Sequence, residues 1–64
     1  MALNQGPQRA AAVVLLVESN ARKRAAKATD LRQAGFEVFQ AADATGAKAI
    51  LNAVVVDVVF SDID

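Results

Sequence analysis

The chain has 64 residues, fewer than the about 100–150 of an ordinary domain, so a monomer has little room for a core. It contains no cysteine and no histidine, which excludes disulfides, thiolate zinc sites and the commonest general base. Seven basic residues balance seven acidic ones, and this zero net charge gives no electrostatic case for binding nucleic acid or an anionic membrane.

Residues 1–12 are predicted to form a flexible N-terminal segment, because they are largely polar at the start and contain the Gly6-Pro7 break. The remaining residues, 13–64, are predicted to fold as one unit. No apolar run approaches the roughly 18 residues of a membrane span, and the N-terminus lacks the pattern of a signal peptide. We therefore expect a soluble cytoplasmic protein.

The first predicted strand is Val13–Val17, an unbroken apolar run typical of a parallel sheet that is buried on both faces. A polar turn follows, and Ala21–Ala34 is then rich in helix-forming Ala, Arg and Lys, with Gly35 at the position of a C-terminal cap. The apolar face of this helix is thin, because Lys27 lies beside Leu31, its only large aliphatic residue. We expect the helix to dock weakly.

The second predicted strand is Phe36–Ala41, whose partial alternation of polar and apolar residues is typical of an edge strand. Asp43 or Thr45 can cap a short second helix that runs to about Asn52.

The third predicted strand is Val54–Phe60, apolar except for Asp57, which we expect to face solvent or cap a loop without a chemical role. Alternating strands and helices predict parallel strands joined by right-handed crossovers. The fold class is thus α/β, a flavodoxin-like parallel sheet of βαβαβ type with strand order 2-1-3. The aromatic residues are expected in the core rather than on a stacking surface: Phe36, Phe39 and Phe60.

Two carboxylates are predicted to meet at the functional edge of this sheet. In open α/β sheets the ligand site lies at the carboxyl ends of the strands, where the strand order reverses, here between the first and third strands. Glu18 and Asp62 follow those strands. Paired carboxylates repel unless a cation lies between them, and oxygen ligands favour a hard cation such as Mg²⁺. A carboxylate beside such a cation can attack phosphorus to form an acyl phosphate.

A simpler interpretation also stands for these acids, which at strand ends are often solvated loop residues or helix caps. The basic residues of the first helix are likewise expected to form a solvated face.

Four segments resemble response-regulator receiver domains of two-component signalling. They match the opening strand with its acidic turn, the junction before the second strand, the second helix, and the strand that carries the phosphorylated Asp: Val14–Asn20, Ala34–Val38, Ala41–Leu51 and Val56–Ile63. The spacing agrees without gaps from Val13 to Asp64. The Phe-Ser-Asp variant resembles receivers attached to hybrid histidine kinases.

The resemblance implies that residues 13–64 are the N-terminal half of a receiver domain, with Asp62 as phospho-acceptor. It implies Mg²⁺ as cofactor, held by Glu18, Asp62 and the main-chain carbonyl of Asp64, and a histidine kinase or phosphotransfer protein as phosphodonor. Ser19 stands where the family has a second acid, which should weaken metal binding. The family's hydroxyl residue and lysine would lie on later strands, so we expect impaired phosphoryl acceptance by these 64 residues, and no enzymatic activity of their own.

The remaining expectations concern self-association of the chain and the functions that compete with phosphoryl acceptance. The third strand would expose an unpaired edge, which favours a symmetric homodimer or exchanged oligomer. The competing hypothesis is a degenerate receiver-like module that self-associates without phosphorylation. A nucleotide-binding Rossmann-like half is disfavoured, because no Gly lies in the turn after the first strand.

Overall fold

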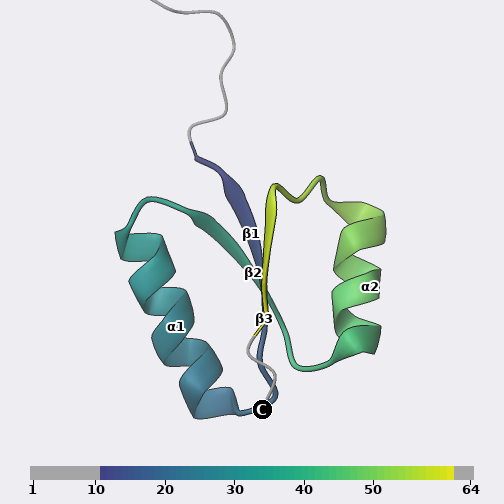
Figure 1. Cartoon of the computed structure of the whole chain (residues 1–64), viewed down its shortest axis with the longest axis horizontal. Helices are drawn as coiled ribbons and strands as arrows, with labels where there is room; N and C mark the ends of the chain where they lie inside the picture. The colour runs from purple at the N-terminus through teal and green to yellow at the C-terminus, as the bar shows by residue number, and fades with distance from the viewer. Residues whose placement is uncertain (1–10, 62–64) are drawn as a thin grey trace, which may run out of the picture.

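The computed structural model describes residues 11–61 as a three-stranded parallel sheet flanked by two helices (Figure 1). The elements in chain order are β1 (Val13–Val17), α1 (Ala21–Gln33), β2 (Glu37–Ala41), α2 (Ala44–Ala53) and β3 (Val58–Ser61). The strand order is β2-β1-β3, and both pairs are parallel. This confirms the predicted α/β layout, βαβαβ with order 2-1-3. Most of the predicted N-terminal segment, residues 1–10, lies outside the described residues.

The core is split between the two faces of the sheet, because successive residues of β1 point to opposite sides. One buried cluster faces α2 and consists of Leu15, Ala41 and Ala47. The other faces α1 and consists of Leu16, Ala28 and Val38. Leu15 and Leu16 are both fully buried, since β1 has a strand on each side and a helix over each face. The two helices therefore lie on opposite faces of the sheet, as Figure 1 shows.

Both helices begin at side chains that accept a main-chain hydrogen bond. The Asn20 side chain accepts from the Lys23 N–H at 2.9 Å, and the Asp43 side chain accepts from the Gly46 N–H at 2.8 Å. After α1 the chain turns at Gly35, whose φ of 102° lies in the region that favours glycine. The predicted starts and ends of these helices hold to within a residue.

The prediction for the third strand was wrong in its first half. α2 continues to Ala53, and the N–H of Val54 donates to the carbonyl of Ile50, so this part of the apolar run completes the helix. Val55 is 81% exposed. The strand begins only after Asp57, whose carboxylate accepts from the Val13 N–H at 2.7 Å and whose own N–H donates to the Val13 carbonyl at 2.9 Å. Asp57 is exposed and its carboxylate also fixes the loop before β3, so both expectations for this residue hold.

The prediction that the aromatic residues lie in the core was also partly wrong. Phe39 is half-buried and packs on the α2-side cluster, but Phe36 and Phe60 are 37% and 41% exposed. Phe60 is exposed because neither helix backbone approaches β3 closely, whereas both helices pack on β1 and β2, and only the long Lys27 side chain of α1 reaches its ring within the described residues. All four residues of β3 are exposed.

Candidate functional site

The strands all end at one level, which defines the carboxyl edge of the sheet. Val17, the last residue of β1, pairs with Ala41 of β2 on one side and with Ser61 of β3 on the other. Parallel strands in this register deliver the residues that follow them to the same edge. The residue after Val17 is Glu18. The residue after Ser61 is Asp62, which lies outside the described residues, as does Asp64.

Glu18 is the one buried charged residue in the part of the chain that the structure describes, with 3% of its surface exposed. Its main-chain N–H donates to the Ala41 carbonyl at 3.0 Å, which extends the pairing of β1 with β2 by one residue. Its carboxylate lies against the turn that follows β1, where the Oε2 atom accepts a hydrogen bond from the Asn20 N–H at 2.9 Å. Sequence reasoning placed Glu18 at this edge, and the structure adds that it is held in a buried conformation there.

The Glu18 carboxylate retains capacity for another partner. A carboxylate has about four acceptor positions on its two oxygens. Within residues 11–61, the Asn20 N–H is its sole hydrogen-bond donor. The nearby guanidinium of Arg24 donates at 2.9 Å to the main-chain carbonyl of Glu18 instead. Oxygen ligands of this kind suit Mg²⁺, so Glu18 fits a hard cation as a single ligand.

The described residues do not supply a complete metal site. Between residues 11 and 61, no group of three acidic, histidine or cysteine side chains is placed to hold an ion. Ser19, at the second acidic position of the receiver pattern, is exposed. A Mg²⁺ site would therefore need the predicted ligands Asp62 and Asp64, and neither is described.

Asp43 is another acid just beyond the carboxyl end of a strand, and sequence reasoning gave it only a capping role. The structure agrees, because its carboxylate caps α2 through the Gly46 N–H and the residue is exposed. No ligand is needed to explain it.

Two basic residues of α1 contact the strand ends, which the sequence analysis missed. Arg24 binds the Glu18 carbonyl, and the Lys27 ammonium nitrogen lies 5.2 Å from the centre of the Phe60 ring, within the range of a cation–π contact. Both are half-buried, so the expectation of a solvated basic face was wrong for them, although Arg22 and Lys23 are exposed. The sequence did indicate this position of Lys27. It precedes the sheet-facing Leu31 by four residues and therefore lies on the same side of the helix.

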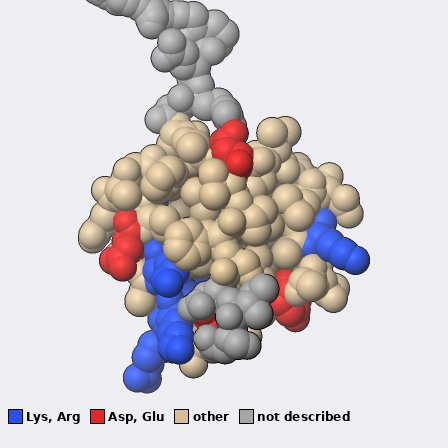
Figure 2. Space-filling model, viewed as in Figure 1, with Lys and Arg blue, Asp and Glu red and all other residues tan. Residues whose placement is uncertain are grey.

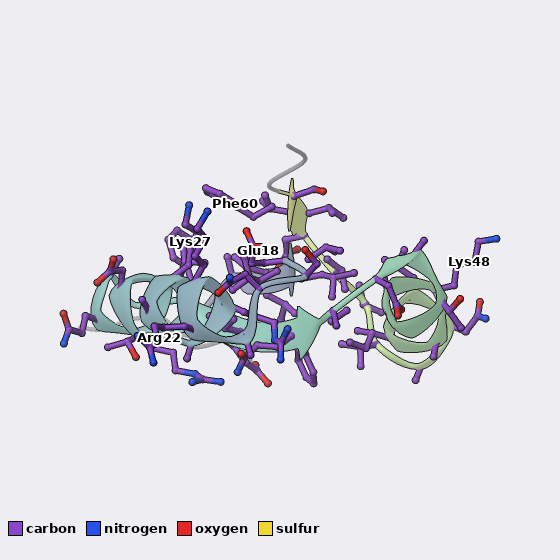
Figure 3. The ribbon with its side chains drawn as sticks, turned by 90° about the horizontal axis from the view of Figure 1, so that it is seen from below. Glu18, Arg22, Lys27, Lys48 and Phe60 are labelled. Atoms are coloured by element: carbon purple, nitrogen blue, oxygen red, sulfur yellow. The ribbon has the colours of Figure 1, made fainter. Side chains whose placement is uncertain are left out.

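The views of the molecule agree on where this basic group lies. In Figure 2, Lys and Arg side chains gather over the lower half of α1, toward the carboxyl edge. Figure 3 looks at that edge and shows Glu18 in the same region as Lys27 and Phe60, whereas Lys48 lies on the far side of α2. The carboxyl edge between β1 and β3 thus combines a buried carboxylate with two nearby cations.

Neither α1 nor α2 is long and apolar enough to cross a membrane. No protein-family model, curated protein or solved structure matches the chain.

Proposed function

We propose that the chain is a phospho-accepting receiver module of a cytoplasmic two-component phosphorelay, with Asp62 as the acceptor. One observation carries the proposal: Val17 and Ser61 pair at the carboxyl edge, and the residues that follow them in the chain are Glu18 and Asp62. These two acids follow neighbouring parallel strands at the point where the strand order reverses. Open α/β sheets bind their ligands at this position.

The proposed reaction is transfer of a phosphoryl group to a carboxylate. An oxygen of Asp62 attacks the phosphorus, a P–O bond forms, and the bond from phosphorus to the donor's leaving group breaks. With a phosphohistidine of a histidine kinase or phosphotransfer protein as donor, the broken bond is P–N and its electron pair returns to the imidazole. The product is an acyl phosphate, as expected for a carboxylate nucleophile.

Glu18 supports the proposal because its carboxylate is buried, oriented and not fully hydrogen-bonded within the described residues. Mg²⁺ would offset the charge of the phosphoryl group, with Glu18, Asp62 and the Asp64 carbonyl as ligands. The Ser at position 19 removes one acid from this set, so we expect weak Mg²⁺ binding.

The test is labelling by a small acyl phosphate in the presence of Mg²⁺, followed by intact mass measurement. Because phosphoryl acceptance by these residues is expected to be impaired, slow and partial addition of one phosphoryl group is expected for the native chain, and none for Asp62→Asn. The matched control is Asp43→Asn, which alters an acid that follows another strand while keeping a side chain able to cap α2. Labelling of Asp62→Asn at the native level, or equal loss in both variants, would rule the proposal out.

Glu18→Gln separates the role of Glu18 from that of Asp62. The Gln side chain still offers an oxygen to the Asn20 N–H but carries no charge for a cation. We expect it to lose about tenfold or more of the Mg²⁺-dependent labelling, the range seen when residues supporting a metal site are changed. Labelling that is insensitive to both Mg²⁺ and Glu18→Gln would show that Glu18 has only a structural role.

A further inference from the structure

Lys27 of α1 is a half-buried cation that has no acidic partner among the described residues. Its ammonium nitrogen lies 5.2 Å from the centre of the Phe60 ring, and within residues 11–61 it forms no ion pair and no hydrogen bond. An ammonium group has three N–H donors, and a cation–π contact leaves them able to bind oxygen. The Phe60 ring thus holds Lys27 in place while its donors stay available to a ligand.

The Phe60 ring that Lys27 contacts is on the same face of the sheet as Glu18. Phe60 pairs with Leu16 of β1, and Leu16 belongs to the cluster that faces α1. Residues two apart along a strand share a face, which places Glu18 on the α1 face after Leu16. Figure 3 shows Glu18, Lys27 and Phe60 in one region. The proposed acceptor, Asp62, follows Phe60 by two positions in the sequence.

We infer that Lys27 binds the anionic oxygens of a phosphoryl group at the carboxyl edge. This role rests on the proposed function, since the ligand is the phosphoryl group of the phosphodonor, or the same group after its transfer to Asp62. Hydrogen bonds between an ammonium and a phosphate oxygen join two charged partners, and they are stronger than a contact with a ring face. A phosphoryl group would therefore draw the ammonium of Lys27 away from Phe60 and onto its own oxygens.

The other basic residues at this end of α1 are less suited to the role. The guanidinium of Arg24 already donates to the Glu18 carbonyl at 2.9 Å. Arg22 and Lys23 are exposed, so water and salt screen their charges. Lys27 is the half-buried cation of this group whose donors are not engaged.

The acids at this end of the sheet favour a further cation beside a phosphoryl group. Glu18 follows β1, and Asp62 and Asp64 follow β3 in the sequence, so these three carboxylates carry three negative charges. One Mg²⁺ and the guanidinium of Arg24 can offset that charge, but a phosphoryl group adds more. Without Lys27, the added charge would have no half-buried counterpart on the described part of α1, and like charges at close range repel.

Titration with inorganic phosphate, followed by NMR of the lysine side chains, tests the binding directly. With Mg²⁺ present, the signals of the Lys27 CεH₂ group are expected to shift in a saturable way. Lys48 is the internal control, because it is exposed and Figure 3 shows it on the far side of α2. Asp62→Asn should show the same saturable shift at Lys27, since the ammonium is unchanged. Equal shifts of both lysines, without saturation, would overturn the inference.

Two substitutions separate phosphate binding from packing on Phe60. Lys27→Met keeps an unbranched side chain against the ring but removes the charge, and Lys27→Arg keeps the charge. With a small acyl phosphate as donor, Lys27→Met is expected to lower the initial rate of labelling by about tenfold or more, the effect of one hydrogen bond to a charged group. Lys27→Arg should restore most of that rate, and the control Lys48→Met should match the native chain. Urea denaturation shows whether Lys27→Met is still folded.

The outcomes for Lys27 and for Asp62 are distinguishable. If Asp62→Asn is unlabelled while Lys27→Met is labelled at the native rate, Asp62 stands as the acceptor and the role of Lys27 is overturned. Equal losses in Lys27→Met and Lys27→Arg, without a saturable phosphate shift, would show that Lys27 only packs α1 on β3. If the native chain is not labelled but phosphate shifts Lys27 and not Lys48, the proposed function fails and the anion site at Lys27 stands.

Discussion

At the scale of single residues, three of the described acids that lie next to strands each accept a hydrogen bond from a main-chain N–H. Glu18 accepts from Asn20, Asp43 from Gly46, and Asp57 from Val13. For Asp43 and Asp57, both exposed, such a bond is a sufficient explanation of the residue. Glu18 differs because it is buried, and its carboxylate, which among the described residues accepts from the Asn20 N–H alone, can also bind a cation.

Asp57 gives the sharpest stability prediction at this scale. Its carboxylate joins residues 44 positions apart and satisfies the N–H of Val13, which is 6% exposed. Asp57→Ala leaves this buried donor without its acceptor, so we expect a loss of about 1–2 kcal/mol in the free energy of unfolding. Asp57→Asn keeps an acceptor oxygen and should lose less.

Urea denaturation at one fixed protein concentration measures the difference. Asp30→Ala is the control, because Asp30 is an exposed acid of α1. If Asp57→Ala were as stable as the native chain, the bond to Val13 would contribute nothing to β3 docking.

The sequence predicted some of these residue roles and missed others for a physical reason. Glu18 was found because the topology alone brings it to the carboxyl edge. The contacts of Arg24 and Lys27 were missed because long, charged side chains normally extend into solvent, and their bending onto Glu18 and Phe60 depends on how α1 is rotated on the sheet. Asp62 and Asp64 lie outside the described residues, so their assigned roles stay predictions.

At the scale of elements, α1 rests on the sheet through a small side chain. Ala28 is 1% exposed and lies against Leu16 and Val38, while Leu31 is only half-buried. These contacts fit the expected thin apolar face, although the strength of docking stays a prediction. The small volume of Ala28 lets the helix approach the sheet closely.

Ala28→Leu should therefore destabilise the chain by about 1–3 kcal/mol, because added methylene groups have no space at a packed helix–sheet contact. Ala25→Leu is the matched control on the exposed side of the same helix, and it should change stability by less than about 0.5 kcal/mol. Thermal unfolding of both variants at equal concentration makes the comparison. Equal stabilities would mean that α1 can shift to accommodate the larger residue.

Element types and order were predictable, whereas the start of β3 was not. The run from Val54 to Val56 is as apolar and β-branched as the strand itself, so local propensity cannot place the boundary. The boundary is set by contacts outside the run: Val54 closes α2 through the Ile50 carbonyl, Val56 packs on the α2-side cluster, and Asp57 is fixed by Val13. These contacts cannot be predicted from the run of valines itself.

At the scale of the whole molecule, cover is uneven across the sheet. β1 lies between two strands and two helices, while among the described residues β3 has β1 on one side and is contacted by α1 through the Lys27 side chain at Phe60. Segments with few apolar contacts open at lower free energy than the core. The β3 amides that bond to β1 should therefore exchange with solvent at least about tenfold faster than those of β1.

Hydrogen exchange followed by NMR, at one low protein concentration, tests this difference. Equal protection of β1 and β3 at low concentration would show that the strands open together.

The uneven cover of the sheet also predicts the order in which its strands and helices form during folding. β1 meets β2 across a loop of about half the length that separates it from β3, and both helices pack on the β1–β2 pair. Shorter loops close at lower entropic cost, so β1, α1, β2 and α2 should form the nucleus and β3 should join late. A Val59→Ala substitution should then speed unfolding and leave the folding rate nearly unchanged, whereas Val38→Ala should slow folding. The opposite pattern of rates would place β3 in the nucleus.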